Sequence, residues 1–359
     1  MSGIGSALGI VVTKVRARTL SRRIAGETVS ATPVAVYFAD APQSLYQLRR
    51  WYRVLEALDA RYPTSIITSD PATYAMVRRE TTIAVTFASG APQLARVLDR
   101  QQVRVVLYPN HNALNFRVLR FSAPVHVFIG HGESGKESSV SRQLKAYDLD
   151  FVADRAALDQ LRSIRGYDAD ASAVIVGSPW LGLFGSPPTG WGEDDRKVVL
   201  YAPTWEGDRP SMDYSSVETL GRHIVAAVLG SPDLRLIYRP HPWLGRVRAA
   251  SANADAQLRR MIETAHRGDV VDTGEYGWAL LAADIGVADV SSVAHDVRVL
   301  GKPLLLTDAV QASDAAGIRD AIEHALLVNA STVPAPDTSM TGFLAGIATA
   351  LNMSTPPTL

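Results

Sequence analysis

Short runs of β-branched and aliphatic residues alternate along the chain with longer segments whose apolar residues recur every three to four positions. Before residue 182 the apolar runs are VAVYFAD, TSIITSD, TIAVTFA, VRVVLYP, VHVFIG and AVIVG; after residue 196 they are KVVLYAPTW, LRLIYRP, DVVDTG, IGVADV and PLLLTD. Alternation of buried strands with helical segments is typical of βαβ units and a parallel sheet. The pattern therefore predicts an α/β fold in both halves of the chain.

The two halves are separated by residues 182–196, which are rich in Gly and Pro and lack a hydrophobic period, as expected of an interdomain linker. We expect one doubly wound, Rossmann-like domain over residues 31–181 and a second over residues 197–335, facing a central cleft. A basic segment, residues 1–30, precedes them, and a helix with a tail, residues 336–359, follows. Ligands of such sheets bind at the carboxyl ends of strands, so the chemistry is expected there.

Charge and composition narrow the classes of function. With 36 Lys and Arg against 36 Asp and Glu in 359 residues, the chain carries no net charge. A nucleic-acid partner is not expected, because such proteins neutralise phosphates with a basic face. The chain has no cysteine, which excludes disulfides, thiolate metal sites and a cysteine nucleophile and suits a cytoplasmic protein.

The amino-terminal stretch SALGIVVTKVRARTLSRRIAG joins a short apolar run to several Lys and Arg residues, with no acidic residue before Glu27. Such a segment can lie on an anionic membrane surface, which would place the protein peripherally on the inner face of the cell membrane. A solvated amino-terminal helix is the alternative. No stretch reaches the roughly 18 to 20 consecutive apolar residues that a membrane span requires.

Two basic side chains end the apolar run LRLIY in the second half. Arg239 and His241 alternate with Pro240 and Pro242, and proline restricts both its own backbone and that of the residue before it. A stiff loop that carries Arg and His suits a diphosphate, since Arg offers a planar fork of donors and His a titratable donor. An ordinary proline-rich turn is the alternative.

Two further strand ends in the second half carry polar residues. The run IGVA ends at Asp289, and Ser291 and Ser292 follow where a helical pattern begins; hydroxyls and amides at a helix N-terminus bind anions, although simple capping uses the same residues. Thr204 and Trp205 end the run KVVLYAP. Thr204 could donate to a phosphate and Trp205 could cover a base or ribose; a packed turn is the alternative.

The stretch GHGESGKESSV, residues 130–140, follows the apolar run VHVFIG. It matches Gly-x4-Gly-Lys, but Glu137 stands where a phosphate-binding loop needs Ser or Thr to ligate magnesium, which argues against that loop. His131 lies between two glycines, which let the backbone approach a ligand closely and leave the imidazole exposed. His131 is therefore a candidate general base, with a buried, hydrogen-bonded histidine as the alternative.

Taken in chain order, these motifs resemble the CDP-glycerol:glycerophosphotransferase family, the teichoic-acid primases and polymerases of bacterial cell walls. The motifs that carry the resemblance are His131-Gly132 with Lys136, Gly177-Ser178-Pro179, Pro203-Thr204-Trp205, His241-Pro242, Asp289-Val290-Ser291-Ser292 and Lys302-Pro303. The similarity covers roughly residues 105 to 310. Gly130 and Glu206 depart from it, because the family usually has an aromatic residue before His-Gly and a basic residue after Pro-Thr-Trp.

The resemblance implies a GT-B-like architecture and a transferase that moves a glycerol-phosphate or related polyol-phosphate unit from a CDP-activated donor to a lipid-linked or glycan acceptor. Its implied catalytic residues are His131, as the base for the acceptor hydroxyl, and His241, at the diphosphate. The implied substrate-binding residues are Gly132, Lys136, Thr204, Trp205, Arg239, Asp289, Ser291 and Ser292. No metal or cofactor is implied. A GT-B glycosyltransferase that uses a nucleotide sugar and a non-catalytic nucleotide-binding protein are the alternatives.

Overall fold

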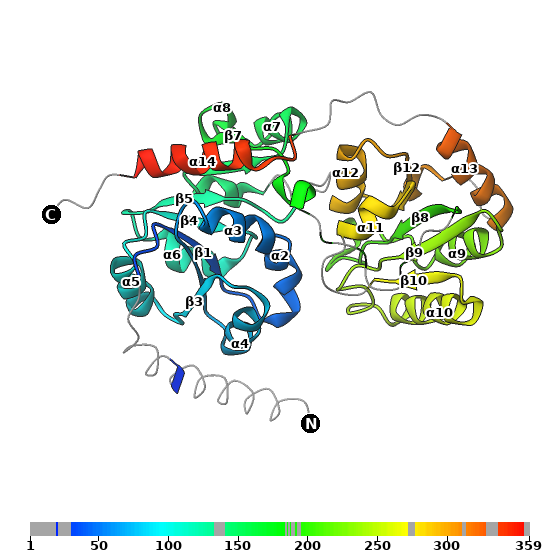
Figure 1. Ribbon diagram of the computed structural model, residues 1–359, viewed down its shortest axis with the longest axis horizontal. Helices are drawn as coiled ribbons and strands as arrows, with labels where there is room; N and C mark the ends of the chain where they lie inside the picture. Colours follow the sequence, from blue (N-terminus) through cyan, green and yellow to red (C-terminus); the bar gives the residue numbers. More distant parts are fainter. Residues whose placement is uncertain are drawn as a thin grey trace. The chain divides into compact units, whose positions relative to one another are not determined.

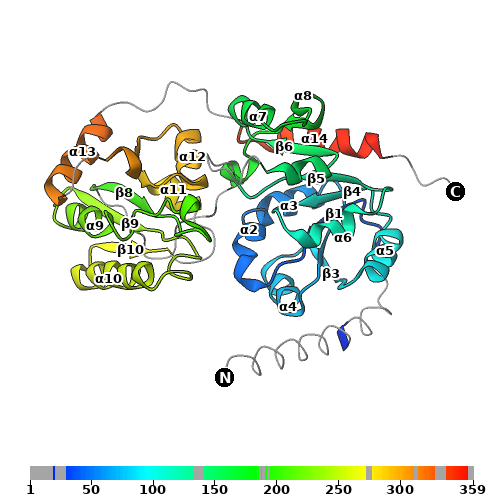
Figure 2. The same ribbon diagram turned by 180° about the vertical axis from the view of Figure 1, so that it is seen from behind.

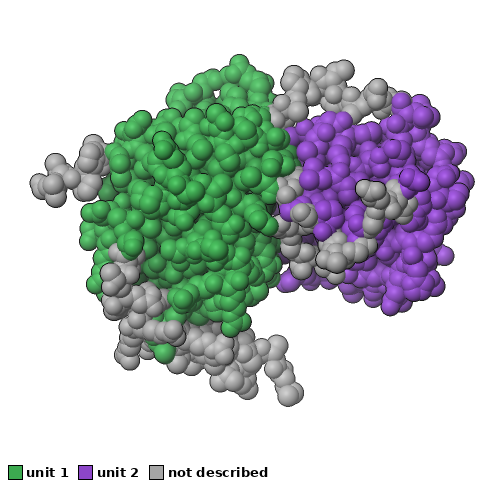
Figure 3. Space-filling view, in the orientation of Figure 1, with its two compact units in different colours: residues 1–131, 140–183, 337–359 green, residues 132–139, 184–336 purple. Residues whose placement is uncertain are grey.

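The computed structural model describes residues 19–20, 30–132, 141–183, 185, 187, 191, 195–271, 277–310, 314–327 and 337–354. The chain forms two compact units, one of residues 1–131, 140–183 and 337–359 and one of residues 132–139 and 184–336 (Figure 3). We call them unit 1 and unit 2. Each is an α/β unit built on a parallel sheet, so the predicted fold class is confirmed. Lys136 and nearly all of the basic segment, residues 1–30, lie outside the described residues.

Unit 1 contains a sheet whose strands lie in the order β3-β2-β1-β4-β5-β6-β7. The strands are β1 (Val34–Phe38), β2 (Thr64–Thr68), β3 (Ala84–Phe87), β4 (Val105–Tyr108), β5 (Val125–Phe128), β6 (Leu149–Val152) and β7 (Ala173–Ile175). All the pairings are parallel. Strand β1 is a continuous apolar run and all of its residues are buried, as expected of a strand that is covered on both faces. The order reverses between β1 and β4, which is where doubly wound sheets bind ligands.

Helices connect the strands of unit 1. They are η1 (Pro42–Ser44), α2 (Leu45–Arg49), α3 (Tyr52–Asp59), α4 (Pro71–Glu80), α5 (Ala91–Arg100), η2 (Ala113–Asn115), α6 (Phe116–Leu119), η4 (Arg142–Ala146), α7 (Arg155–Arg162), α8 (Ala169–Ser172) and η5 (Pro179–Leu183). Asp70 caps α4 by accepting hydrogen bonds from the backbone N–H groups of Ala72 and Thr73, which satisfies donors that the first turn leaves unpaired.

The last helix, α14 (Met340–Met353), returns to unit 1 and packs against β4, β5 and β7 (Figures 1 and 2). Phe343 is fully buried there against Trp51 and Phe151. Gly346 permits the close approach, because a Cβ atom at that position would lie 2.7 Å from the ring of Phe151. The helix is thus part of the hydrophobic core of unit 1, although unit 2 precedes it in the chain.

Unit 2 contains a smaller parallel sheet with the order β10-β9-β8-β11-β12. Its strands are β8 (Lys197–Ala202), β9 (Leu234–Tyr238), β10 (Gly268–Val270), β11 (Ile285–Ala288) and β12 (Leu304–Leu306), and its helices are η6 (Pro210–Met212), α9 (Gly221–Leu229), α10 (Ala249–Ala265), α11 (Gly277–Ala282), α12 (Ser292–Val299), η7 (Thr307–Ala309) and α13 (Ala315–Leu327). The order reverses between β8 and β11. Within the described residues, no helix of either unit combines the length and hydrophobicity needed to cross a membrane.

Candidate active site

The candidate site of unit 2 lies where the strand order reverses. Ala202 at the end of β8 pairs with Ala288 at the end of β11, so the segments that follow these strands leave the sheet at the same edge. This register brings together Thr204 and Trp205 after β8 and Ser291 and Ser292 after β11. Sequence motifs about 85 residues apart are therefore neighbours in space, as the hydrogen bond from Thr204 N–H to the Asp289 carboxylate shows directly.

Asp289 holds three loops of this edge together. Its Oδ2 accepts hydrogen bonds from the backbone N–H groups of Thr204 at 2.7 Å and Ser216 at 3.2 Å, and its Oδ1 accepts from the hydroxyl of Thr307 at 2.5 Å. Asp289 is fully buried and Thr204 is 2% exposed. Burial raises the pKa of Asp289 above its usual value, although these hydrogen bonds oppose the shift. Such burial favours a supporting role for both residues over the predicted contact with substrate.

The N-terminus of α12 presents two hydroxyl groups at the same edge. Ser291 is the N-cap and accepts a hydrogen bond from Ala294 N–H at 3.4 Å, and Ser292 is the first helical residue. Both residues are half-buried. Gly286 of β11 lets the helix approach, since a Cβ atom there would lie 2.8 Å from Val297 of α12. The amides and the positive end of the helix dipole suit an anion such as phosphate.

The loop after β9 places His241 beside the end of β8. Its backbone N–H donates to the carbonyl of Pro203, and its ring stacks on Trp205 with centroids 6.2 Å apart and planes at 22°. Trp243 packs edge-on against Trp205 at 5.4 Å. The backbone N–H of Trp243 donates to His241 Nδ1 at 3.1 Å. Since Nδ1 accepts, a neutral His241 carries its proton on Nε2 and presents a donor there.

Arg239, which was also predicted at this loop, is half-buried at the end of β9. Its backbone N–H donates to the carbonyl of Tyr201 on β8. The backbone of Arg239 is therefore tied to β8 and that of His241 to the residue directly after it, which fixes the start of the loop. The predicted pair thus lies at the edge that also carries Trp205.

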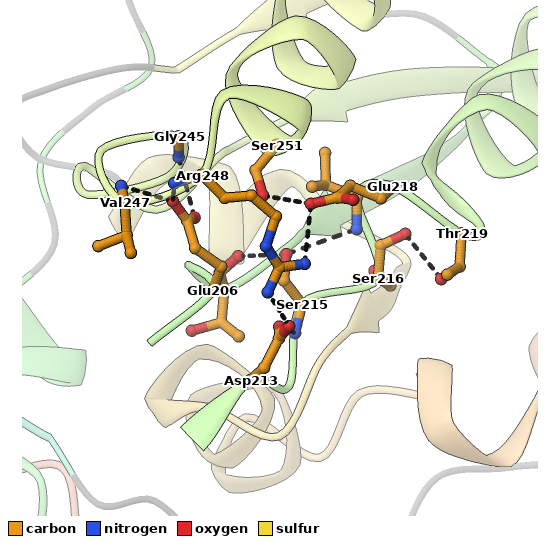
Figure 4. Close-up of polar contacts among 12 residues, drawn as sticks. Glu206, Asp213, Ser215, Ser216, Glu218, Thr219, Gly245, Val247, Arg248 and Ser251 are labelled. Atoms are coloured by element: carbon orange, nitrogen blue, oxygen red, sulfur yellow. Dashed lines mark hydrogen bonds and ion pairs between the residues drawn. The ribbon is translucent and has the colours of Figure 1, made fainter. Parts of the chain in front are cut away.

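Glu206 was not predicted to have any role beyond a departure from the family pattern. Its side chain is 2% exposed and accepts hydrogen bonds from the backbone N–H groups of Gly245 at 3.0 Å and of Val247 and Arg248 at 2.9 Å (Figure 4). These amides immediately precede α10. The carboxylate therefore links the end of β8 to the loop that carries His241.

In unit 1, His131 follows β5 in a turn that requires glycine. Gly130 has φ of +60° and Gly132 has φ of +132°, conformations that glycine adopts without a steric penalty. The indole N–H of Trp51, the residue before α3, donates to the Gly130 carbonyl at 2.6 Å, which holds the turn beside the start of that helix. His131 is half-buried and meets the ring of Tyr46 edge-on at 6.0 Å.

The tautomer of His131 follows from its backbone partner. Its Nδ1 lies 3.1 Å from the carbonyl oxygen of Pro109, and a carbonyl oxygen only accepts hydrogen bonds. Nδ1 therefore carries a proton, and a neutral ring has its lone pair on Nε2. That is the arrangement a general base needs.

A polar cluster that the sequence analysis missed supports this turn. Asn110, only 2% exposed, donates through Nδ2 to Asp40 Oδ2 at 2.5 Å and to Gln47 Oε1 at 2.7 Å. Asn115 donates in turn to the Asn110 carbonyl. Asp40 follows β1 and Asn110 follows β4, the two strands at which the order reverses. Polar residues directly after two neighbouring strands were the signal that could have identified them.

The comparison with known families bears on the candidate site of unit 2 and not on His131 of unit 1. Residues 191–310 match the family model described as CDP-Glycerol:Poly(glycerophosphate) glycerophosphotransferase. This segment is therefore similar to the glycerophosphotransferase family. It contains the strand ends with Trp205, His241, Ser291 and Ser292, so the predicted resemblance is confirmed there. His131 lies outside the matched residues, and its role stays a prediction.

Solved structures resemble both units of the chain. UDP-GlcNAc 2-epimerase from Neisseria meningitidis bound to UDP-GlcNAc has a TM-score of 0.60 at 11% identity, covering 90% of this chain and 100% of its own. The MnaA–UDP complex from S. aureus has 0.58 at 14%, covering 89% and 97%. The wall teichoic acid polymerase TagF, soaked with CDPG, has 0.55 at 12%, covering 94% and 93%. At these identities the likeness shows the GT-B-like fold alone. No curated protein matches the chain in sequence.

Two further motifs of the resemblance, Lys302-Pro303 and Gly177-Ser178-Pro179, make contacts within the fold. Lys302 donates through Nζ to the carbonyls of Leu281 and Ala283 at the end of α11, and burial lowers its pKa. Gly177 has φ of +77°, and a Cβ atom there would lie 2.0 Å from the Asp337 carbonyl oxygen. These motifs therefore maintain the fold of their own units, Lys302 in unit 2 and Gly177 in unit 1.

No metal centre is evident in the described part of the chain, where no cluster of three or more His, Asp or Glu side chains could hold an ion. Asp150 of β6 is a buried carboxylate of unit 1, and it accepts a hydrogen bond from the hydroxyl of Tyr167. Burial raises its pKa to about 7. Asp170 pairs with Arg162 on the surface.

Proposed function

We propose that the chain transfers a glycerol-phosphate, or a related polyol-phosphate, from a CDP-activated donor to an acceptor hydroxyl in teichoic-acid-like cell-wall polymer synthesis. The observation that carries this proposal is the set of donors at the reversal point of unit 2. The serine hydroxyls and amides at the start of α12 and the Nε2–H of His241 suit a diphosphate, and Trp205 offers a flat apolar surface to the nucleoside. This set lies in the segment that matches the glycerophosphotransferase family.

In the proposed reaction, Nε2 of His131 accepts the proton of the acceptor hydroxyl as its oxygen attacks the phosphorus that bears glycerol. The bond from that phosphorus to the bridging oxygen breaks, CMP leaves with the bond's electron pair, and a phosphodiester forms. Positioning and donors to the phosphate oxygens supply most of the catalysis in such transfers. His241 and the start of α12 fill that role.

A glycosyltransferase that uses a nucleotide sugar is the second candidate, because the epimerase and MnaA structures that share the fold are named with UDP-GlcNAc and UDP. Transfer of phosphoglycerol releases a nucleoside monophosphate, whereas transfer of a sugar releases a diphosphate. Incubation of the full chain with CDP-glycerol, CDP-ribitol and several nucleotide sugars, followed by mass spectrometry of the released nucleotide, separates the two. Release of a diphosphate from a nucleotide sugar, with no CMP from either CDP-polyol, contradicts the proposal.

The acceptor is proposed to be lipid-linked or a glycan, and the protein to work in the cytoplasm with residues 1–30 held at the inner face of the membrane. The reason is the excess of Lys and Arg in that segment, which anionic lipids attract. Sedimentation of the full chain with phosphatidylglycerol vesicles tests this, with phosphatidylcholine vesicles as the control. Equal binding to both vesicles contradicts the electrostatic anchor.

A further inference from the structure

The N-terminus of α10 is bound by a carboxylate from a distant part of the chain. This helix has 17 residues, its N-cap Arg248 makes no side-chain cap, and its first turn contains no acidic residue. The amides of Gly245, Val247 and Arg248 donate instead to Glu206, 39 to 42 residues earlier in the sequence. An array of backbone N–H groups before a helix is the arrangement that binds phosphate in many proteins. Here an internal anion occupies it.

The charge of Glu206 is retained despite its burial. Burial alone would raise its pKa, but the hydrogen bonds from the backbone amides outweigh that effect and leave the pKa below its usual value. Hydrogen bonds to a carboxylate are stronger than those between neutral groups. Gly245 has φ of +76°, and a Cβ atom there would lie 2.6 Å from Cα of Ala252, so the backbone that presents these amides is itself tightly constrained.

Glu206 and Trp205 connect the same two loops. Trp205 contacts the rings of His241 and Trp243 at the start of the β9–α10 loop, and Glu206 binds the amides at its end. The side chain of Arg248 makes separate contacts, because its guanidinium pairs with Asp213 and Glu218 (Figure 4). Ser251 also donates to Glu218. The loop that carries His241 is thus fixed at both ends by consecutive residues.

We infer that Glu206 is a built-in anion that positions the His241–Trp243 loop and closes the N-terminus of α10 to external phosphate. While the carboxylate is bound, a ligand cannot use the amides of residues 245, 247 and 248. This inference rests on the proposed function only where it concerns the donor nucleotide. It gives the acidic residue after Pro-Thr-Trp a structural role in this chain, because its carboxylate holds the end of the loop.

The test compares Glu206→Gln with Glu218→Gln, a carboxylate of the same cluster that is bonded to side chains. The protein is labelled with fluorotryptophan, and the Trp205 and Trp243 resonances are assigned by replacing each with Phe. We expect Glu206→Gln to shift or broaden both resonances and Glu218→Gln to leave them in place. We also expect a roughly tenfold rise in the Kd for CMP, equivalent to about 1.4 kcal/mol, in Glu206→Gln alone. Equal effects of the two variants on resonances and affinity would overturn the inference.

Rescue by a small anion tests whether the negative charge of Glu206 is what matters. If Glu206 only filled space, acetate would not stabilise a variant that lacks it. In Glu206→Ala the vacated amides are expected to bind acetate, which raises the Tm of the variant by several degrees over chloride at equal ionic strength and leaves the wild-type Tm unchanged. Glu206→Asp, which keeps the charge, is expected to give resonances closer to wild type than Glu206→Gln does. Acetate that stabilises both proteins equally, or neither, would contradict a built-in anion. If wild type does not bind CMP, the proposed function fails, whereas the resonances and the acetate response still decide the role of Glu206.

Discussion

His131 in unit 1 and His241 in unit 2 occupy similar positions but have opposite hydrogen-bonding roles. Each follows a strand of its sheet, each is half-buried, and each uses Nδ1 to bind a backbone group. His131 Nδ1 faces the carbonyl of Pro109 and must donate, whereas His241 Nδ1 faces the N–H of Trp243 and must accept. A neutral His131 therefore has its lone pair on Nε2, and a neutral His241 has its proton there.

The difference shows that the tautomer of a neutral histidine is set by the backbone group that it contacts. A lone pair on Nε2 suits the removal of a proton from an acceptor hydroxyl. A proton on Nε2 suits a hydrogen bond to a phosphate oxygen. In the proposed reaction His131 would supply the base and His241 the donor, so variants of each residue are expected to affect different kinetic parameters.

The largest effect is expected from His131→Asn. The Asn amide can still donate to the Pro109 carbonyl, which preserves the turn, but it offers no base. Loss of a general base costs roughly 10²- to 10⁴-fold in kcat, while the Kd for CMP should stay unchanged. Steady-state kinetics and calorimetry measure the two quantities. His324→Ala, at an exposed residue of α13, is the control. Full activity of His131→Asn would show that His131 is not the general base.

His241→Asn is expected to weaken nucleotide binding. The Asn carbonyl can accept the hydrogen bond from Trp243 N–H, so the loop is retained, but the donor to phosphate is lost. A hydrogen bond to a charged group contributes about 1.5 to 3 kcal/mol, which corresponds to a Kd for CDP-glycerol roughly 10 to 150 times higher. Calorimetric titration measures it. An unchanged Kd would mean that the two histidines do not divide the roles as their tautomers suggest.

The sequence predicted the strands and the residues at their ends because both leave local patterns. The run VAVYF became the fully buried strand β1, as a continuous apolar run should. Trp205 and His241 were expected at one edge because each follows a strand, and their rings are in contact. Local chain order and the geometry of parallel sheets were sufficient for this part of the site.

The partners of these residues could not be predicted, because they depend on contacts between distant segments. In the sequence, Glu206 was only a departure from the family pattern. In the structure, its carboxylate binds backbone amides about 40 residues away, the farthest 42 residues along the chain. Asp289 was expected to bind a ligand, yet it is fully buried and its carboxylate accepts hydrogen bonds from three residues of the chain. The tautomers of His131 and His241 depend likewise on a carbonyl and an N–H that no sequence pattern identifies.

A smaller effect is expected from the polar cluster that supports His131. Asn110→Asp replaces the hydrogen bond to Asp40 by repulsion between two carboxylates and displaces the adjacent Pro109 carbonyl. We expect kcat to fall roughly tenfold, equivalent to about 1.4 kcal/mol, with the Kd for CMP unchanged. The double variant Asn110→Asp with Asp40→Asn restores a donor and an acceptor in exchanged positions and should recover most of the loss. If the double variant is no better than the single one, the cluster does not act through this hydrogen bond.

The smallest effect compares two serine N-caps, Ser291 of α12 in unit 2 and Ser339 of α14 in unit 1. Replacement of either by Ala should lower the free energy of unfolding by about 1 kcal/mol, because each caps a helix. Only Ser291→Ala should also raise the Kd for CMP, by roughly 2- to 12-fold, since one neutral hydrogen bond contributes about 0.5 to 1.5 kcal/mol. Urea unfolding measures the first quantity and calorimetry the second. An equal change of CMP affinity in both variants would show that the loss follows from general destabilisation, and that the hydroxyl of Ser291 is a cap without a phosphate partner.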